Sequence, residues 1–455
     1  MFRTFHGAVL CIATGLATSA LTVQAQALAE PTAEGYLYRE LFGDGLERDY
    51  GIKIDGYMQA GIGYNDKSTA AMRAAGNSNF PVAPGDEGFK LEDLHLHLKK
   101  PLKTNILPRI SPLPGPMPQD VSFGMEIDLL YGRSGQPAAM FGIDKEWGIN
   151  RPGNTDPKTA ALNRQNFLAV PQFFVQAFFP VWNGIAVTAG RFGAGIGYEI
   201  APQHRPTPNV FYTRSYAYVS QPQQVFGLLG SMNLVQSRSS LVSAEVGVVN
   251  GWQNLKDNND TKSLMGAIRW RSADMKQAVN YAFITGNEQT KPGEMPQAPV
   301  SMITSPRGQN RQHHSINGYL EIGKGWSAAG ELVYGSQDGD GRPDTVHLLS
   351  GPRFSGAKYA GANGILSYRL TDRVKTNLRL EHFRARDGFG LFPLTAVKSD
   401  FNAMTFGLNY QLNKYVSIRP EVRHDWQSHN NGAKAFGAGT AEKQTTIAED
   451  VVIRF

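Results

Sequence analysis

The chain has 455 residues, with 45 Lys and Arg against 39 Asp and Glu, which gives a formal net charge of +6. The two signs are interspersed, without a basic block or a set of interleaved aromatic residues, so we expect no nucleic-acid partner. The single cysteine, Cys11, lies in the N-terminal segment, which excludes disulfides, thiolate metal sites and cysteine nucleophiles from the mature chain.

Residues 1–27 have the pattern of a secretory signal peptide. Arg3 precedes an apolar run from Ala8 to Val23, and small residues follow it as cleavage sites. The run is too short for a membrane span. Residues 28–49 form a separate periplasmic or lumenal segment, which could contain a short helix, and residues 50–455 are predicted to be one barrel.

Apolar and polar residues then alternate in stretches of about ten. From Tyr50 to Tyr64 the even positions are mostly apolar and the odd ones mostly polar or small, a pattern that would leave a helix without an apolar stripe. We place strands at about 50–64, 89–99, 121–132, 167–181, 184–192, 224–234, 240–250, 262–270, 277–286, 313–322, 326–336, 357–370, 373–384, 402–411, 414–425 and 445–455. Mean hydropathy is −0.32, as expected where half of the strand positions are polar.

The connections alternate in length. Tight turns at 182–184, 323–325, 370–373 and 412–414 separate long polar connections at 65–88, 134–166, 193–223, 287–312, 337–356, 385–401 and 426–444. This segregation predicts an all-β fold, a transmembrane antiparallel up-and-down β-barrel of about 16 strands with short periplasmic turns and long extracellular loops. One connection does not match this alternation: Leu102–Asp120 is long and rich in proline, although it lies on the short-turn rim. It is either an ordered periplasmic cap or a strand pair that the pattern does not reveal.

The last strand, Thr445–Phe455, ends on an aromatic residue. It resembles the C-terminal assembly signal of outer-membrane barrels, although an edge strand of a soluble sandwich would show the same alternation. In a barrel it must pair with the first strand, because an open edge cannot lie in lipid. The predicted partners are therefore outer-membrane lipid and, through the Phe455 strand, the barrel assembly machinery.

Several stretches together resemble the OmpL-like β-barrel porin family of Gram-negative bacteria. They are Ser122–Gly132 (SFGMEIDLLYG), Gly190–Ile200 (GRFGAGIGYEI), Asn209–Gly230, Val248–Gly251 (VVNG), Glu381–Gly388 (EHFRARDG), Arg419–Trp426 (RPEVRHDW) and Thr446–Phe455. The resemblance spans nearly the whole mature chain in order. It implies an exported outer-membrane barrel that acts as a porin, without a known solute or catalytic residue.

If the apolar face of each strand meets lipid, the other face lines the pore. The predicted pore-lining charges are Glu126, Asp128, Arg369, Lys375, Arg379, Glu381, Arg419, Glu421 and Arg423. The acidic pair on the third strand lies roughly opposite the basic residues of the twelfth and thirteenth, which predicts a transverse field that sets ion preference. Local salt-bridge ladders are the alternative. The field hypothesis predicts that Arg379→Glu shifts the reversal potential toward cations.

The connection 193–223 is the candidate for a loop folded into the pore. Its candidate constriction residues are Tyr198, Glu199, His204, Arg205, Tyr212 and Arg214. The alternative is a loop that covers the extracellular mouth. Strict alternation puts Arg191 on the lipid side, so a lumenal Arg191 requires a β-bulge, for which Gly190 is the candidate.

No catalytic residue, cofactor or metal site is predicted. His95 and His97 share one strand face and could chelate a metal, but the sequence shows no third ligand nearby. The favoured function is a porin for passive diffusion of small hydrophilic solutes and ions, with a homo-oligomer left open.

Two other functions remain open. A surface-binding barrel would act through loops 134–166, 287–312 and 426–444, with the lumen plugged by residues 30–49. A membrane-embedded lipid hydrolase would hide its catalytic residues without a motif.

Overall fold

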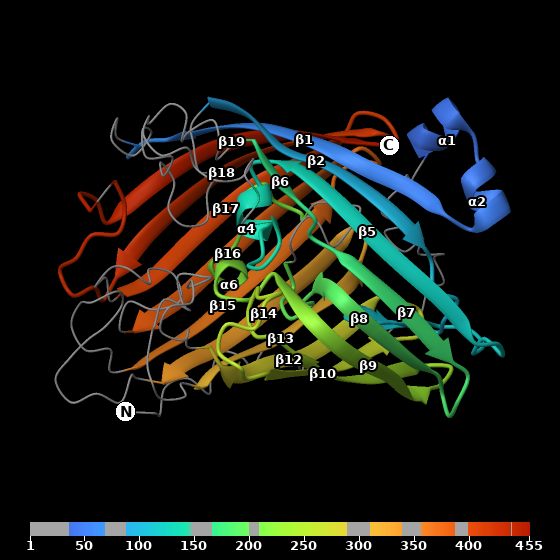
Figure 1. The fold of residues 1–455 in the computed structure, drawn as a ribbon. Coiled ribbons are helices and arrows are strands. Elements are labelled where there is room, and N and C mark those ends of the chain that lie inside the picture. The colour runs from blue at the N-terminus through green and yellow to red at the C-terminus, as the bar shows by residue number, and fades with distance from the viewer. Residues whose placement is uncertain are drawn as a thin grey trace.

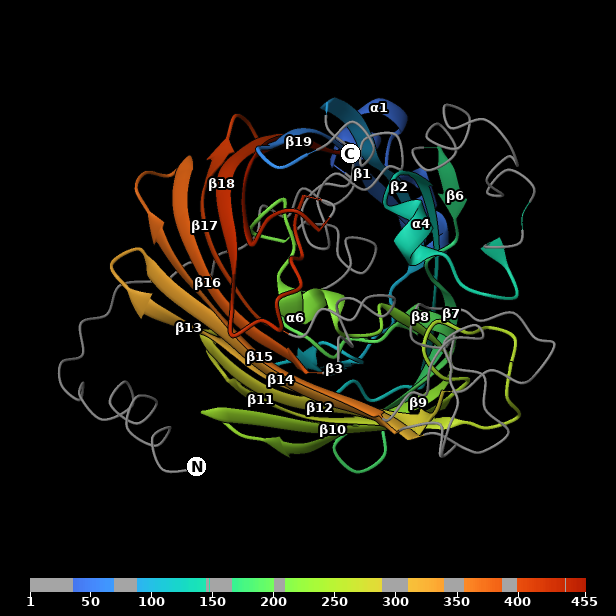
Figure 2. The ribbon, with the colours of Figure 1, turned by 90° about the vertical axis from the view of Figure 1, so that its left-hand side faces the viewer.

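The computed structural model describes residues 36–68, 88–144, 147, 166–199, 209–288, 310–338, 356–386, 399–437 and 439–455. Within these residues one antiparallel sheet closes on itself into a barrel (Figures 1 and 2). Strands β6 (Phe167–Ala169) and β7 (Phe173–Phe179) pair with successive parts of β5 (Ser122–Gly132) and together form one interrupted strand of the wall. The wall therefore has 16 strands, and the predicted fold class is confirmed.

The observed strands match the predicted ones closely. The remaining wall strands are β1 (Lys53–Asn65), β2 (Gly88–Lys100), β8 (Ile185–Gly193), β9 (Gln224–Gln236), β10 (Ser240–Val249), β11 (Ser263–Ser272), β12 (Gln277–Asn287), β13 (Asn310–Gly323), β14 (Trp326–Asp338), β15 (Gly356–Arg369), β16 (Val374–Arg386), β17 (Ser399–Gln411), β18 (Val416–Ser428) and β19 (Lys443–Arg454). No helix among the described residues is long and apolar enough to cross a membrane.

The first and last wall strands close the barrel, as predicted. Strand β1 pairs with β19 from Asn65 opposite Thr446 to Tyr57 opposite Arg454. Beyond β19, Phe455 donates its backbone N–H to the carbonyl of Gly56 at 3.0 Å and accepts one from Gly56 at 3.0 Å. The terminal residue thus takes part in the last hydrogen-bond pair of the seam.

The wall separates two surroundings, as its alternation predicts. On β18, Glu421 and Arg423 face the lumen and are buried, whereas Val422 between them faces outward and is 46% exposed. On β1, Gln59 is buried inside while Ile62 and Tyr64 are exposed outside. Large apolar side chains on the outer face and polar ones on the inner face are typical of a membrane barrel.

The described residues of the N-terminal segment, from Tyr36 onward, lie outside the lumen. Helices α1 (Tyr36–Phe42) and α2 (Gly45–Tyr50) sit beside β1 at the end of the barrel that carries the short turns (Figure 1). Glu40 forms an ion pair with Lys414 at 2.5 Å, in the turn between β17 and β18. The described part of residues 30–49 therefore does not plug the lumen, and the predicted signal peptide, residues 1–27, lies outside the described residues.

The proline-rich connection after β2 turns into the barrel. Strands β3 (Ile106–Leu107) and β4 (Ser111–Pro112) form a small separate hairpin inside the ring (Figure 2). Asn233 of β9 donates to the carbonyl of Asn105 at 2.9 Å, and Arg271 of β11 donates to Ser111 Oγ at 2.9 Å. We call residues 101–120 the lumenal arm. It is an ordered element against the inner wall, and it adds no strand pair to the barrel.

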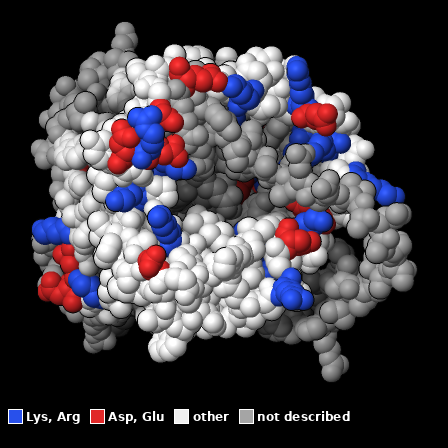
Figure 3. Space-filling model, turned by 90° about the vertical axis from the view of Figure 1, so that its right-hand side faces the viewer, with Lys and Arg blue, Asp and Glu red and all other residues white. Residues whose placement is uncertain are grey.

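The short-turn end is hollowed at its centre. Figure 3 shows this hollow surrounded by both Lys or Arg and Asp or Glu side chains. The charges on this face are thus mixed in sign.

Candidate functional site

A loop between β8 and β9 crosses the inside of the barrel. We call its described residues, 194–199 and 209–223, the lumenal loop; they include the short helix α6 (Tyr216–Val219) (Figure 2). The helix contacts β14, β15 and β16, on a part of the wall far from β8 and β9 in the sequence. The loop therefore occupies the lumen, as one of the two sequence-based alternatives expects.

Carboxylates of the wall hold the backbone of this loop. Glu421 of β18 accepts hydrogen bonds from the N–H groups of Tyr212, at 2.8 Å, and Thr213, at 3.1 Å. Glu381 of β16 accepts from the N–H of Tyr216 at 2.7 Å. A buried N–H group needs a partner, and these loop groups have no neighbouring strand to supply one. Ionised acceptors make such bonds stronger than neutral ones do.

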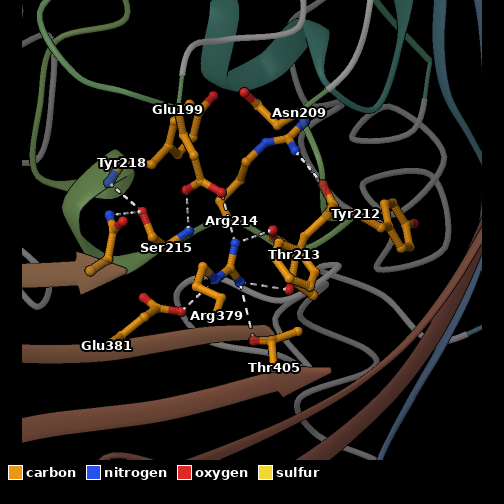
Figure 4. A network of polar contacts seen from close by, with 12 residues as sticks. Glu199, Asn209, Tyr212, Thr213, Arg214, Ser215, Tyr218, Arg379, Glu381 and Thr405 are labelled. Carbon is orange, nitrogen blue, oxygen red and sulfur yellow. Dashed lines mark hydrogen bonds and ion pairs between the residues drawn. The ribbon is translucent and has the colours of Figure 1, made fainter. Parts of the chain in front are cut away.

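Arg379 is the central cation of this contact (Figure 4). Its guanidinium contacts Glu199 of the loop at 2.7 Å and donates to the carbonyl of Thr213 at 3.0 Å. It also contacts Glu381 at 2.9 Å, and its side chain has no exposed surface. One arginine thus joins the wall strand to two separate points of the loop.

The other predicted wall charges also have partners, where contacts are described. Arg423 contacts Glu381 and Asp425, both at 2.7 Å, and Arg419 pairs with Asp450. Gln172 donates to Glu126 at 2.7 Å and to Asp128 at 2.8 Å, while Arg369 is exposed at the end of β15 and Lys375 lies opposite it on β16. Most of these charged side chains therefore form ion pairs or hydrogen bonds with other residues of the wall and the loop, as the alternative of local salt-bridge ladders expects.

The predicted loop residues have distinct surroundings. Tyr212 donates its hydroxyl to Glu92 of β2 at 2.6 Å, and β2 is separated from β18 in the wall by β19 and β1. Arg214 donates to the carbonyl of Phe211 at 3.0 Å and lies over the ring of Tyr218. Tyr198 lines a small cavity described below. His204 and Arg205 lie outside the described residues.

Arg191 points inward although alternation predicts the opposite. Its guanidinium contacts Asp144 at 2.6 Å, with both side chains fully buried. Pairing with β7 continues through Phe174 opposite Gly190 and Phe173 opposite Arg191, so no residue is inserted and the expected β-bulge is wrong. The break does occur at Gly190, whose φ of 131° is accessible to glycine and redirects the chain.

Three arginines that the sequence analysis did not select meet at the arm. Arg109 of the arm, with Arg269 and Arg271 of β11, lines a cavity of about 70 Å³ together with Tyr198 and Asn317. Arg109 comes from a segment without periodicity, so nothing in the sequence places it in the lumen. Alternation along β11 does place Arg269 and Arg271 on the inner face and could have identified them.

We expect low pH to weaken the attachment of the lumenal loop to the wall. Burial by itself raises the pKa of Glu199, but the Arg379 charge and the hydrogen bond from Ser215 outweigh it and hold the pKa below its ordinary range. A carboxyl whose pKa is lower in the docked state stabilises docking above its ordinary pKa of about 4.3, and this stabilisation is lost as pH falls through the lowered value. We expect added current noise below about pH 4, recorded from single channels. Glu199→Gln should lack this acid transition; an identical transition in that variant would contradict the assignment.

Comparisons with known proteins agree on the architecture. The family model described as "Putative beta-barrel porin-2, OmpL-like" matches residues 51–455. A search of curated proteins found no match. Among solved structures, the outer membrane channel DcaP of Acinetobacter baumannii superposes with a TM-score of 0.52 at 10% identity, covering 89% of this chain and 97% of that one.

Two further structures share the fold. The anion-selective porin from Comamonas acidovorans has a TM-score of 0.50 at 12% identity, over 89% of this chain and 99% of that one. Salmonella typhi OmpF, in complex with daunomycin, has a TM-score of 0.50 at 10% identity, over 89% and 97%. Because the family model covers the entire barrel, the chain belongs to the OmpL-like β-barrel porin family and is an outer-membrane porin, a channel for passive diffusion of small hydrophilic solutes.

Proposed function

We propose that this porin favours anions and that Arg109, Arg269 and Arg271 set the preference. Solutes would pass between the lumenal loop and the lumenal arm, and the arginine-lined cavity lies where these two elements meet β11. Rings of fixed charge determine which ions a pore admits. Diffusion of this kind needs no covalent chemistry, so we propose no enzymatic activity.

The charge balance around this cavity supports the proposal. No carboxylate is among its lining residues. Behind the lining, Glu245 pairs with Arg269 at 3.0 Å, and Glu126 and Asp128 attract Arg109. Arg109 is held in place by Phe174 and Phe192, whose ring centroids lie 4.9 and 5.3 Å from its guanidinium carbon. Three cations and no carboxylate line the cavity, which gives its surface a local positive charge. The carboxylates behind the lining and the partly aqueous lumen offset this charge only in part.

The ion pairs under the lumenal loop contribute less to selectivity. Arg379 and Arg423 have no exposed surface and contact carboxylates directly, so their fields are largely cancelled at the passage. The Comamonas acidovorans porin is described as anion-selective, which shows that this fold can carry such a preference. In this chain the preference would come from Arg109, Arg269 and Arg271 themselves.

The test is the reversal potential in a KCl gradient. Arg109→Gln and Arg271→Gln should each lower the anion-to-cation permeability ratio by on the order of fivefold, the equivalent of about 1 kcal/mol for charges 4 Å apart in water. Arg373→Gln removes the same charge from an exposed turn on the short-turn rim and is the matched control. An unchanged ratio in the two lumenal variants, or an equal shift in the control, would refute the assignment.

We also propose that the porin forms a homo-oligomer through β17–β19 and β1. Glu449 lies exposed on the outer face of β19, halfway along the strand, where a charge facing lipid is unfavourable. It borders an external groove of about 410 Å³ lined by Ile62, Phe406 and Pro420. Contact with a second copy would remove both Glu449 and this groove from lipid.

Glu449→Leu should change the oligomer mass measured in detergent by light scattering; an identical mass would argue against this interface.

A further inference from the structure

We propose that His95, His97 and Asp128 form a binding site on the lumenal wall for a divalent transition cation such as Zn²⁺, Cu²⁺ or Ni²⁺. The three side chains are buried on the inner face of β2 and β5, and each offers a ligating atom, all within 4.8 Å of one another. This site goes beyond passive diffusion and does not depend on the ion preference proposed above.

Strand register supplies the ligand that the sequence analysis lacked. Residues two apart on a strand point to the same side, which places His95 and His97 together on the inner face of β2. The pairing of β2 with β5 sets Asp128 directly opposite His97. A contact between residues 31 positions apart in the chain thus completes a set of two imidazoles and one carboxylate.

The distances suit a small cation. His97 Nδ1 lies 2.9 Å from Asp128 Oδ1, and His95 Nε2 lies 3.5 Å from Asp128 Oδ2. Tetrahedral ligands bound at about 2.0–2.1 Å are about 3.4 Å from each other, so small side-chain shifts would seat the ion. The cation would replace the protons now shared between the histidines and the carboxylate.

A second layer of groups orients two of the ligands. The Tyr57 hydroxyl lies 3.4 Å from His95 Nδ1 and 3.3 Å from Asp93 Oδ2, which forms a chain from a carboxylate through a phenol to an imidazole. Gln172 donates to Asp128 Oδ2 at 2.8 Å. Outer groups of this kind fix ring orientation and raise affinity in metal sites.

The ligand set selects the chemical class of the ion. Imidazole nitrogens favour Zn²⁺, Cu²⁺ and Ni²⁺, whereas Mg²⁺ and Ca²⁺ require oxygen ligands. His97 Nε2 has no hydrogen-bond partner among the described residues, which leaves a second nitrogen for coordination after rotation of the ring. Occupancy would place two positive charges on the wall formed by β2 and β5.

The first experiment is equilibrium dialysis of the refolded full-length mature chain, without a histidine tag, against ZnCl₂ and separately against MgCl₂. We expect one Zn²⁺ per chain and no Mg²⁺. His95→Gln and His97→Gln should each weaken Zn²⁺ binding by about 100-fold or more, and Tyr57→Phe by about tenfold, within the range for outer groups. His313→Gln is the control, because His313 is also buried and lumenal but bonds to Tyr359.

A second measurement does not depend on the variants folding. Electron paramagnetic resonance of Cu²⁺ added to the unaltered porin should show coupling to two imidazole nitrogens. No stoichiometric Zn²⁺ binding, affinity unchanged in both histidine variants, or a Cu²⁺ spectrum without nitrogen coupling would each overturn the site. Channel conductance recorded in the presence of a chelator reports separately on the porin function.

Discussion

Arg379→Met is expected to release the lumenal loop and to raise single-channel conductance several-fold, with frequent current steps between levels. The variant leaves Glu199 buried without its contacting cation, whereas Glu381 keeps its contact with Arg423. Removing one partner from a buried ion pair costs about 3–5 kcal/mol, because the remaining charge is uncompensated. Moving Glu199 and its loop into open water relieves that cost, and the space that the loop occupied becomes available to ions.

Two controls separate anchoring from charge. Lys375→Met removes the same charge from the inner face of the same strand and should shift the reversal potential without current steps. Combining Arg379→Met with Glu199→Gln removes both charges of the loop contact and should restore part of the quiet, low-conductance state. If Arg379→Met shifts only the reversal potential and leaves the conductance unchanged, Arg379 acts through its field and the anchoring role is wrong.

Gly56→Val is expected to prevent closure of the barrel. A Cβ at Gly56 would lie 2.2 Å from the carbonyl oxygen of His95 and 2.7 Å from the ring of Phe455. The first of these neighbours is backbone and cannot move without breaking the pairing of β1 with β2. Overpacking of a well-packed site usually costs about 1–3 kcal/mol, and a backbone clash at the seam should exceed this range.

The measurement is heat-modifiable migration on gels of protein refolded into lipid. Gly364→Val is the matched control, because Gly364 also faces outward from a strand interior and a Cβ there meets nothing within 4 Å. We expect folded protein for Gly364→Val and little for Gly56→Val. Equal yields would show that the seam tolerates a side chain at Gly56.

We also propose that the terminal strand engages the assembly machinery. Deleting Phe455 should then lower the yield of folded protein in cells more than it lowers the yield of refolding.

Sequence alone predicts the wall well because two independent signals coincide there. Alternation with a period of two marks each strand, and the alternation of short and long connections fixes the topology. Predicted and observed strands differ by only a few residues at their ends, as for 445–455 and β19. The hairpin of β3 and β4 is not predicted, because strands of two residues are too short to show an alternation of apolar and polar positions.

The lumen is less predictable because contacts there join distant parts of the chain. Alternation places Arg379 on the inner face, but its burial depends on the position of the loop that carries Glu199 in the folded barrel. Likewise, His97 and Asp128 meet only once the register of β2 against β5 is known. Strand faces can therefore be read locally, whereas partners require the three-dimensional arrangement.

The attachment of the lumenal loop imposes an order on biogenesis. The residues that hold it follow it by a long stretch of chain: Arg379 comes 180 residues after Glu199, and Glu421 comes 209 after Tyr212. Contacts so remote in sequence form slowly. The lumenal loop can dock only after β16 and β18 have taken their places in the wall, so the lumen is narrowed late in assembly.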